Sequence, residues 1–598
     1  MTHPAPALRI AVLVKQIPKF EEMRLGPDGR LVRAGLELEM NAYCRRAVAK
    51  AVELVAELGG SCTVVTLGPP PAVDVLREAI AWAEARGVRM RGLHLCDPAH
   101  AGSDTLATAR ALAAVLRLEG SFDLVLVGRN SVDADTGQVG PQVAALLDLP
   151  FASGVREIAV HGGEGSVAAE VRCEHDDGWV QARVALPAVL STAERLTAPC
   201  KVDAVGREGV AHGRIRRLTA AELGPGPWGE AASPTRVGAT RVHEIVREKR
   251  MLVGTAAEQV AEAVALLRER GALDPDAAAS DVGAVPPSGG GSARLGVVVE
   301  PGRSHLTREM LGAAAGLAVE LGGTVTAIGP QVTDAWTLAS WGADAVTRLT
   351  GSSIEEDIAA GVAAWAAAND ASVLLVPSTA WGREVAARVA VDRGAGLVGD
   401  AMGLAVADGR LVAWKPAFGG QLVAAITSAT SLQMATVRAG ALPRLRERAG
   451  RAPVTSVALA PRGRVTVRHR ERDDDIDVLA EARMVIGVGA GLPPGDHELL
   501  QPLVSVLGAE LAATRKVTDK GWLPRARQVG ITGRSIAPHL YVAVGISGKF
   551  NHAVGIRRAG TVVAINSDPA AAIFGFADIG LVGDWRDIVS ALSAALTG

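Results

Sequence analysis

Apolar residues in this chain follow two spacings, short continuous runs and a three-and-four-residue repeat, which are typical of strands and helices. Residues 540–546 (LYVAVGI) form such a run, whereas residues 255–270 (TAAEQVAEAVALLRER) place apolar side chains at helical spacing. Val- and Leu-rich runs alternate with Ala-rich helical stretches over most of the length. This order predicts an α/β fold.

Two stretches of the N-terminal half have weak copies further along the chain. Residues 57–69 (ELGGSCTVVTLGP) resemble 320–330 (ELGGTVTAIGP), and residues 123–128 (DLVLVG) match 372–377 (SVLLVP). The first pair predicts a helix end, a glycine stop and a strand. Duplicated α/β modules would pack as a pseudo-symmetric pair. Because the identity is low, general α/β likeness is the alternative.

Residues 277–294 (AAASDVGAVPPSGGGSAR) are rich in Pro, Gly and Ser and predict a flexible connector between the copies. A third region, without a counterpart in the N-terminal half, predicts strands at 484–486, 540–546 and 561–565 and helices at 497–507 and 586–596. We therefore expect modules at 1–270, 294–475 and 480–598, with a fusion linker over 271–293.

Composition narrows the classes of function. The 598 residues are 48% hydrophobic, and the net charge of −2 with dispersed basic residues argues against a nucleic-acid binder. The five cysteines lack CxxC spacing, so neither a metal site nor a disulfide framework is expected. A signal peptide and a long apolar segment are both missing from the sequence. We expect a cytoplasmic protein, not an integral membrane protein, that binds a small ligand or a protein partner.

The segment from 544 to 552 (VGISGKFNH) follows a strand-like run and concentrates polar chemistry. Gly545 and Gly548 allow the backbone to approach a ligand closely, and the amides after them can face a phosphate. An ordinary strand-to-helix turn is the alternative. That turn would not need the donors of Lys549, Asn551 and His552.

The same segment begins like the nucleophile elbow of a serine hydrolase. The elbow requires glycine two residues after the serine, whereas Lys549 stands two residues after Ser547. No histidine follows the candidate acids in the usual order. Hydrolysis is therefore not expected.

Two polar segments precede this run, with Thr514 and Arg515 in the first and Thr532 in the second. Hydroxyl and guanidinium donors suit a flavin-like heterocycle, because fixed donors and cations favour the negative charge that reduction adds. For Arg515 alone, a solvated surface charge is the alternative. Asn566 ends the next strand, near the position where a doubly wound nucleotide site contacts a ribose.

Residues 128–140 (GRNSVDADTGQVG) form a polar loop between a predicted strand and a predicted helix. Nucleotides bind at such carboxyl ends in open α/β sheets. Helix capping is the alternative explanation for Asp133, Asp135 or Thr136. Asn41 stands just before another helix and is either a wall of this site or a helix cap.

Together these segments resemble an electron-transfer flavoprotein whose β- and α-subunits are joined in one chain, β first. The β-like motifs are AVLVKQ (11–16), MNAYC (40–44), the loop 128–140 and LPAVL (186–190). The α-like motifs are GISGKFNH (545–552), VAINSD (563–568), IF (573–574) and ADIGLVGD (577–584). The resemblance implies an electron carrier with FAD in its C-terminal domain. It also implies a dehydrogenase donor and a quinone-reductase or ferredoxin-type acceptor.

The resemblance assigns FAD contacts to a set of residues in the C-terminal module, without covalent catalysis. They are Thr514, Arg515, Gln528, Val529, Gly530, Ile531, Thr532, Ser547, Gly548, Lys549, Phe550, Asn551, His552, Asn566 and Asp584. It places Arg515 by the reactive edge of the ring, Thr532 near the ring nitrogen that takes the proton, and His552 near the pyrimidine carbonyl. These three would tune the potential, whereas Asn566 and Asp584 would lie toward the adenosine.

The resemblance also implies a second nucleotide site in the β-like part. Its residues are Leu13, Asn41, Cys44, Leu67, Gly128, Asp133, Asp135, Thr136 and Gln138. Simple carriers hold AMP there, and electron-bifurcating relatives hold a second FAD that takes hydride from NADH. Residues 133–141 (DADTGQVGP) are nearer to the bifurcating version, which favours a second FAD. An NADH-oxidising bifurcating enzyme and a redox-inert adenine-nucleotide binder are the competing hypotheses.

Two single positions and one segment depart from the family pattern. The turn at 487–491 (GVGAG) has Ala490 where an arginine is common, and Asn551 stands where glutamine is commoner. Residues 205–217 (VGREGVAHGRIRR) replace a lysine-rich partner-recognition segment. The identity of the partners therefore stays open.

Overall fold

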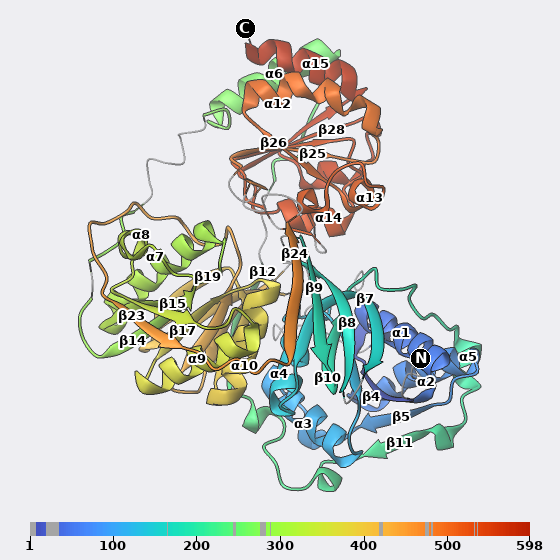
Figure 1. Ribbon diagram of the computed structural model, residues 1–598. Coiled ribbons are helices and arrows are strands. Elements are labelled where there is room, and N and C mark those ends of the chain that lie inside the picture. Colours follow the sequence, from blue (N-terminus) through green and yellow to red (C-terminus); the bar gives the residue numbers. More distant parts are fainter. Residues whose placement is uncertain are drawn as a thin grey trace. The chain divides into compact units, whose positions relative to one another are not determined.

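A computed structural model gives the fold (Figure 1). It describes residues 7–19, 35–163, 166–176, 178–242, 247–274, 283–287, 289–417, 422–472, 478–479, 482–530, 533–534 and 536–597. The chain divides into two compact units. Unit 1 comprises Met1–His175, Trp179–Val242 and Ala284–Glu471, and unit 2 comprises Asp176–Gly178, His243–Gly283 and Arg472–Gly598.

The N-terminal half of unit 1 is built on a long mixed sheet. Its strands, in spatial order, are β11 (Ile215–Leu218), β5 (Met90–Leu95), β4 (Gly60–Leu67), β1 (Leu8–Leu13), β6 (Leu124–Gly128), β10 (Ala188–Thr192), β7 (Phe151–Gly163), β8 (Ser166–His175), β9 (Gly178–Ala185) and β24 (Val465–Arg472). The pairs from β11 to β7 are parallel. A hairpin of β2 (Gln16–Pro18) and β3 (Leu38–Met40) follows β1.

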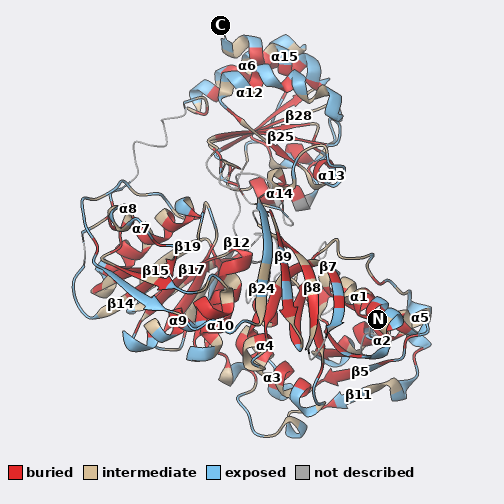
Figure 2. Ribbon diagram, viewed as in Figure 1, coloured by how far each residue is buried: buried red, intermediate tan, exposed pale blue. Residues whose placement is uncertain are grey.

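Helices cover both faces of this sheet, which explains its nearly continuous apolar strands. The helices are α1 (Ala42–Leu58), α2 (Val73–Glu84), α3 (Thr105–Leu118), α4 (Val139–Leu146) and the short α5 (Ala204–Glu208). The apolar sides of α1 and α2 belong to one core, and those of α3 and α4 belong to another. Figure 2 shows the strands as mainly buried and the outer helix faces as exposed.

The second half of unit 1 repeats this arrangement. Its sheet has the order β18 (Gly396–Ala401), β22 (Gln433–Val437), β17 (Val373–Pro377), β14 (Ala293–Val298), β15 (Gly323–Pro330), β16 (Ala345–Thr350) and β23 (Val454–Ala458). Its helices are α7 (Ser304–Leu321), α8 (Ala335–Trp341), α9 (Glu355–Ala368) and α10 (Ala380–Arg393). The order β5-β4-β1-β6-β10 of the first sheet returns as β16-β15-β14-β17-β22. The predicted duplication of α/β modules is confirmed.

Each half also gives one strand to the other. A smaller sheet has the order β12 (Thr235–Val242), β21 (Leu422–Ser428), β20 (Arg410–Ala417) and β19 (Gly403–Ala407), and its β12 comes from the N-terminal half. In return, β24 from the second half lies beside β9 of the first sheet (Figure 1). The two halves of unit 1 are therefore joined through continuous sheets.

Unit 2 is a parallel sheet with helices on both faces. Its order is β13 (Arg250–Leu252), β29 (Ile579–Val582), β28 (Thr561–Asn566), β27 (Leu540–Val544), β25 (Met484–Val488) and β26 (Glu510–Ala513). Helices α6 (Ala256–Glu269), α12 (Gln501–Leu507) and α15 (Trp585–Thr597) share the core of one face. Helix α14 (Phe550–Ile556) lies on the other face, and the short α13 (Arg515–Asp519) follows β26.

Helix α6 belongs to unit 2, although the sequence places it at the end of the first module. Strand β13 adds to the free edge of β29 and carries α6 onto that face of the sheet. The Gln259 side chain donates to the Val582 carbonyl at 3.1 Å and accepts from the Val582 amide at 2.9 Å. Arg247 lies 2.8 Å from Asp578, and both side chains are buried.

Part of the predicted flexible linker is packed. Residues 275–282 and 288 lie outside the described residues. Val285 is buried, and its amide donates to the Arg446 carbonyl at 2.9 Å. Arg448 donates to the Pro286 carbonyl at 2.7 Å. Among the described residues, no helix combines the length and apolar content that a membrane span requires.

The variant Asp578→Asn removes the carboxylate that neutralises the buried Arg247. We expect the free energy of unfolding of unit 2 to fall by about 3–5 kcal/mol, the usual cost of breaking a buried ion pair from one side. Urea-dependent hydrogen exchange of the β28 and β29 amides measures it.

The matched control is Glu262→Gln, which breaks the pair with Arg250 at 2.6 Å, where the side chains are 51% and 43% exposed. An exposed pair of this kind contributes roughly 0–1 kcal/mol. Equal losses in the two variants would contradict the structural role of Asp578.

Candidate functional site

The sheet of unit 2 contains a topological switch point between β25 and β27. From β25 the chain continues to β26 on one side and then crosses to β27 on the other side. Ligands of open α/β sheets bind outside the carboxyl ends of the strands at such a point. Both loops that leave it are glycine-rich, residues 489–491 after β25 and residues 545–548 after β27.

Glycine is required where these two loops meet. A Cβ on Gly489 would overlap the Gly545 carbonyl, and a Cβ on Gly548 would overlap the Ile573 amide. Gly545 and Gly548 also have φ values of 61° and 77°, which favour glycine. The loops after β25 and β27 therefore touch backbone to backbone, and Gly548 packs against the backbone at Ile573.

Exposed polar side chains stand on the second loop. Ser547 and Lys549 are exposed, and α14 begins directly after them at Phe550. The side chains of Phe550 and Asn551 lie outside what the structure describes. A hydroxyl and an ammonium thus lie at the carboxyl end of β27, where a phosphate-bearing ligand would approach.

Thr514 and Arg515 lie at the carboxyl end of β26. The Thr514 amide donates to the Val488 carbonyl at 3.0 Å, which ties this turn to the end of β25. Arg515 pairs with Asp519 at 3.2 Å, and the two side chains are 38% and 37% exposed. An exposed pair of this kind contributes little to stability.

The segment 528–530 lies deeper. Gln528 is buried, and its side chain accepts from the Thr518 hydroxyl at 2.8 Å. The Val529 amide donates to the Ala513 carbonyl at 2.9 Å, and Gly530 has a φ of 137°. Ile531 and Thr532 lie outside the described residues. The Gln528 side chain is therefore turned inward, and its backbone amide donates to the Arg525 carbonyl at 2.8 Å.

His552 is buried in unit 2 with both ring nitrogens engaged. Its Nδ1 lies 3.1 Å from the Val529 carbonyl, and its Nε2 lies 2.9 Å from the Tyr541 hydroxyl. Burial lowers the pKa of His552 to about 4, although the Val529 carbonyl opposes the shift. The imidazole is therefore neutral at physiological pH.

Asn566 and Asp584 have local structural contacts. Asn566 donates to the Ile546 carbonyl at 2.9 Å, which links the end of β28 to the loop after β27. Asp584 accepts from the Arg586 amide at 2.9 Å just before α15. Asn566 ends β28 and Asp584 follows β29, both at the same carboxyl edge as Ser547.

The carboxyl edge of this sheet fits a dinucleotide. Glycine turns bring the backbone close, and hydroxyls and cations stand at the ends of β26 and β27. Anionic phosphates and an electron-rich ring both require such donors. Among the described residues predicted from sequence, Thr514, Arg515, Ser547, Lys549, Asn566 and Asp584 lie at this edge, whereas Gln528, Val529 and His552 are buried behind it.

A second switch point lies between β1 and β6 of unit 1. Leu13 ends β1, Leu67 ends β4 and Gly128 ends β6, so three predicted residues share this carboxyl edge. Lys15 Nζ lies 2.8 Å from both carboxylate oxygens of Asp133, which joins the loops after β1 and β6. The sequence analysis did not single out Lys15 as a site residue, although it lies in the motif at 11–16, two residues after the end of β1.

Asn41 supports the loop and does not cap a helix through its side chain. It donates to the Asn130 carbonyl at 2.8 Å, accepts from the Val132 amide at 3.2 Å, and makes no capping hydrogen bond to α1. Cys44 is buried beside it, and burial raises the pKa of the Cys44 thiol. Asn41 therefore ties the start of α1 to the loop 128–140 instead of capping the helix with its side chain.

Capping also fails to explain the acidic residues of the loop. Helix α4 has Gln138 at its N-cap, and that side chain accepts from the Thr105 hydroxyl at 2.7 Å instead of capping. Asp135 has a φ of 46° and accepts from the Asn130 amide group at 2.5 Å. Thr136 lies against Gly399 of the second half. The loop is therefore held by ionic and polar contacts on both sides.

A buried charge cluster of the second half lies beside this loop and was not predicted. Arg438 donates to both oxygens of Asp400 at 3.1 Å, and Arg383 lies 3.7 Å from Asp400. Although burial raises the pKa of Asp400, the cations Arg438, Arg383 and Lys415 hold it below its usual value. A charged residue inside the apolar strand pattern at 411–417 was the signal for Lys415.

Lys415 is the unusual member of this cluster. It is buried, and within the part of the chain that the structure describes its ammonium has no hydrogen-bond partner. Burial lowers the pKa of Lys415, while Asp400 and Asp135 oppose the shift. A buried cation without a partner is costly, which makes an anion beside it favourable.

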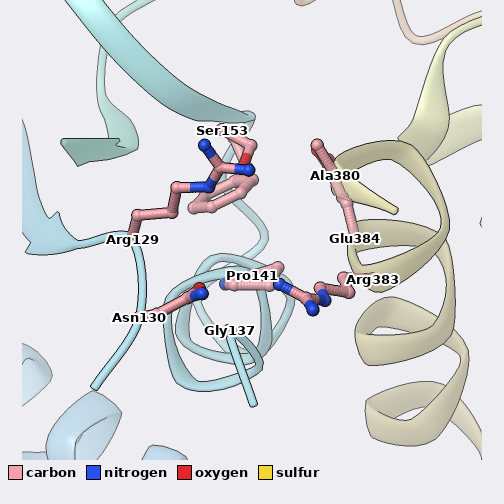
Figure 3. A pocket seen from close by; sticks show the side chains of 9 residues that line it. Arg129, Asn130, Gly137, Pro141, Ser153, Ala380, Arg383 and Glu384 are labelled. Carbon is pink, nitrogen blue, oxygen red and sulfur yellow. The ribbon is translucent and has the colours of Figure 1, made fainter. Parts of the chain in front are cut away.

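A small cavity of about 10 Å³ lies where the loop meets α10. Figure 3 shows Arg129 reaching toward Ser153 and Arg383 reaching from α10 toward Gly137 and Pro141. The volume suits about one water molecule. Residues of both halves thus line the same space.

The segment that replaces the lysine-rich recognition region is exposed. Val205 is 77% exposed on α5. A cavity of about 470 Å³ lies between residues 201–210 and the end of α2. Four arginines remain in the segment, but lysines are absent from it.

Comparison with known families and proteins agrees with this geometry. The family model "Electron transfer flavoprotein domain" matches residues 28–223 and 297–462. The model "Electron transfer flavoprotein FAD-binding domain" matches residues 478–557. The chain belongs to the electron transfer flavoprotein family. Its C-terminal unit carries the FAD-binding domain of that family, and the match includes Thr514 through His552.

Three relatives are each similar to one part of this chain. The "Electron transfer flavoprotein subunit beta" of Thermoanaerobacterium thermosaccharolyticum is 32% identical over 267 residues, covering 44% of this chain and 99% of that protein. The alpha subunit of the same organism is 35% identical over 300 residues, covering 48% of this chain and 91% of that protein. "Protein FixB" of Bradyrhizobium diazoefficiens is 40% identical over 232 residues, covering 37% of this chain. The chain spans 63% of that FixB protein, less than two thirds of its length. The predicted β–α fusion within this family is confirmed.

Replacing Lys15 by Met leaves the buried Asp133 carboxylate without its ammonium partner. We expect a loss of about 1–3 kcal/mol in unit 1, with faster hydrogen exchange in residues 129–138, because a buried acceptor loses its bond. Thermal unfolding and peptide-level exchange measure these effects.

The control is Lys19→Met, since its partner Glu37 has a 63% exposed side chain. That change should leave both readouts within about 0.5 kcal/mol of the parent protein. A loop that exchanges equally fast in both variants would rule out the structural role of Lys15.

Proposed function

We propose that this chain carries electrons on FAD between flavin-dependent dehydrogenases of the acyl-CoA dehydrogenase type and a quinone-reductase or ferredoxin-type acceptor. The observation that carries the proposal is the glycine-lined switch point of unit 2, with Arg515, Ser547 and Lys549 at its edge. We place the carrier in the cytoplasm, because the five cysteines are unpaired.

Different residues of unit 2 are proposed to hold different parts of the cofactor. FAD, when bound, supplies a ring that accepts and releases electrons. Gly545, Gly548 and the amides after them admit the pyrophosphate, and Lys549 offsets its charge. Arg515 favours the negative charge of the reduced ring. Thr532 is proposed beside the ring nitrogen.

The adenosine end is assigned by strand order. Asn566 and Asp584 follow β28 and β29, which lie on the far side of β27 from Arg515. Gln528, Val529 and Gly530 are proposed to contact the FAD. His552 would lie near the pyrimidine carbonyl.

A second nucleotide is proposed between the loops after β1 and β6. FAD is favoured over AMP, because residues 133–141 are close to the bifurcating version of this loop. NADH oxidation with electron bifurcation is the second candidate function. The exposed segment 201–210 is the proposed docking surface for the donor.

The decisive experiment is a chromatographic count of FAD and AMP released per chain. Two FAD per chain support the bifurcating version, and one FAD with one AMP supports the simple carrier. Anaerobic NADH bleaches the flavin in the bifurcating version and leaves it unchanged in the simple carrier. Protein that binds AMP and stays colourless in excess FAD would overturn the proposal in favour of a redox-inert nucleotide binder.

Replacing Arg515 by Met removes the proposed cation at the reactive edge. We expect the midpoint potential of the FAD to fall by tens of millivolts, because a tenfold loss of preference for the reduced form in a one-electron step corresponds to about 59 mV. Spectroelectrochemical titration of the loaded protein measures the potential.

The matched control is Lys516→Met, the next residue of α13, whose side chain is exposed. Its potential should stay within a few millivolts of the parent value. An equal shift in both variants would show a general charge effect instead of a contact of Arg515.

A further inference from the structure

Helix α13 carries both the proposed cation of the FAD site and a carboxylate that lies against it. The Arg515 Nε donates to Asp519 Oδ2 at 3.2 Å, one helical turn further along α13. Asp519 is the only acidic residue of this five-residue helix, which also contains Lys516. The predicted site and the proposed function use Arg515 but give Asp519 no role.

Buried contacts fix the position of α13 beneath this pair. Val517 and Thr518 are buried, and the Thr518 hydroxyl donates to Gln528 Oε1 at 2.8 Å. At the end of the helix the Val517 carbonyl accepts from the Trp522 amide at 3.1 Å. The backbone that carries the pair is therefore held at the carboxyl end of β26. Residues four apart in a helix share one face, so the two side chains meet there.

The contact matters for charge more than for folding. The side chains of Arg515 and Asp519 are 38% and 37% exposed, and a pair with this exposure adds little to the free energy of unfolding. A carboxylate 3.2 Å from Nε nevertheless offsets the charge of the guanidinium, because Coulomb contributions of opposite sign partly cancel at a third site. A negatively charged ligand at the end of β26 thus meets a weakened cation.

We propose that Asp519 is a positioning residue that holds the Arg515 guanidinium through Nε and reduces the stabilisation that this cation gives to the reduced flavin. The inference rests on the proposed FAD site for its functional meaning. The pair would set the potential of the FAD below the value that Arg515 alone would produce. Asp519 acts through Arg515 and is not assigned a contact with the flavin.

The test is Asp519→Asn, which keeps an oxygen acceptor near Nε and removes the negative charge. We expect a two- to fivefold greater preference of the FAD for its reduced form. This change corresponds to a rise of about 20–40 mV in the midpoint potential of a one-electron step, at about 59 mV per tenfold. Spectroelectrochemical titration of the loaded protein measures the potential. A potential that stays at the parent value or falls would overturn the inference.

A double-mutant cycle tests whether Asp519 acts through Arg515. In an Arg515→Met background, Asp519→Asn should move the potential by at most about half as much, because the cation that the carboxylate offsets is gone. Equal shifts in the two backgrounds would mean that the carboxylate acts on the flavin directly, which would overturn the positioning role.

The matched control is Glu510→Gln at the start of β26, the end of the strand away from Arg515. Glu510 pairs with Arg527 at 2.6 Å and has a 40% exposed side chain, so the same charge is lost from a similarly exposed pair. Its potential should stay within a few millivolts of the parent value. A shift as large as that of Asp519→Asn would point to the net charge of the unit and would contradict the inference.

A measurement without FAD separates the contact from the proposed function. Proton–nitrogen NMR spectra of arginine-labelled protein report the Nε–H group, and the Arg515 signal is assigned by its loss in Arg515→Met. We expect this signal to shift in Asp519→Asn and to stay in place in Glu510→Gln. An Arg515 signal that Asp519→Asn leaves unchanged would overturn the contact itself. Protein that shows the shift but binds no FAD would overturn the proposed function and, with it, only the functional meaning of the pair.

Discussion

The hydrogen bonds of two exchanged strands hold the architecture of this chain together. Strand β12 follows the edge strand β11 of the first half and joins β21, and β24 follows the edge strand β23 of the second half and joins β9. The exchange is therefore reciprocal, as the internal repeat requires. After each exchanged strand the chain enters unit 2, first as β13 and α6 and later as the remaining sheet. Unit 2 is consequently assembled from both halves of the sequence.

Both candidate sites lie at a topological switch point of a sheet, but different side chains line them. Each lies where the strand order reverses, so the loops on either side diverge and expose the strand ends. In unit 2 the edge is lined by glycines and exposed donors. In unit 1 the edge is stiffened by the Lys15–Asp133 pair and by the charges around Asp400.

Local sequence patterns predicted most helices and strands of the fold, because each of these elements depends on a few neighbouring residues. The runs at 540–544 and 561–566 are buried strands, and the copies at 60–67 and 323–330 occupy equivalent sheet positions. The helix expected at 497–507 begins as a 3₁₀ helix over Pro494–Leu500 and becomes α-helical only as α12. Proline near the start explains this, since it lacks the amide proton that a helix interior needs.

Features that depend on contacts between residues far apart in the sequence could not be predicted from these local patterns. The amphipathic pattern of α6 shows that one face is buried but not which sheet buries it. Asn41 has the sequence position of a cap, yet its amide group serves a loop 89 residues away. Likewise, the chemistry of His552 is set by Tyr541 and Val529, and neither partner follows from the motif that contains the histidine.

The exchange of β24 also constrains how this protein is made. While the chain leaves the ribosome, β9 stays an open sheet edge until the second half has been synthesised and has folded. Open edges of this kind recruit other strands and favour aggregation. With both halves in one polypeptide, the correct covering strand arrives with every molecule and in equal number. Fusion therefore secures stoichiometry and shortens the time for which a vulnerable edge is available to the wrong neighbour.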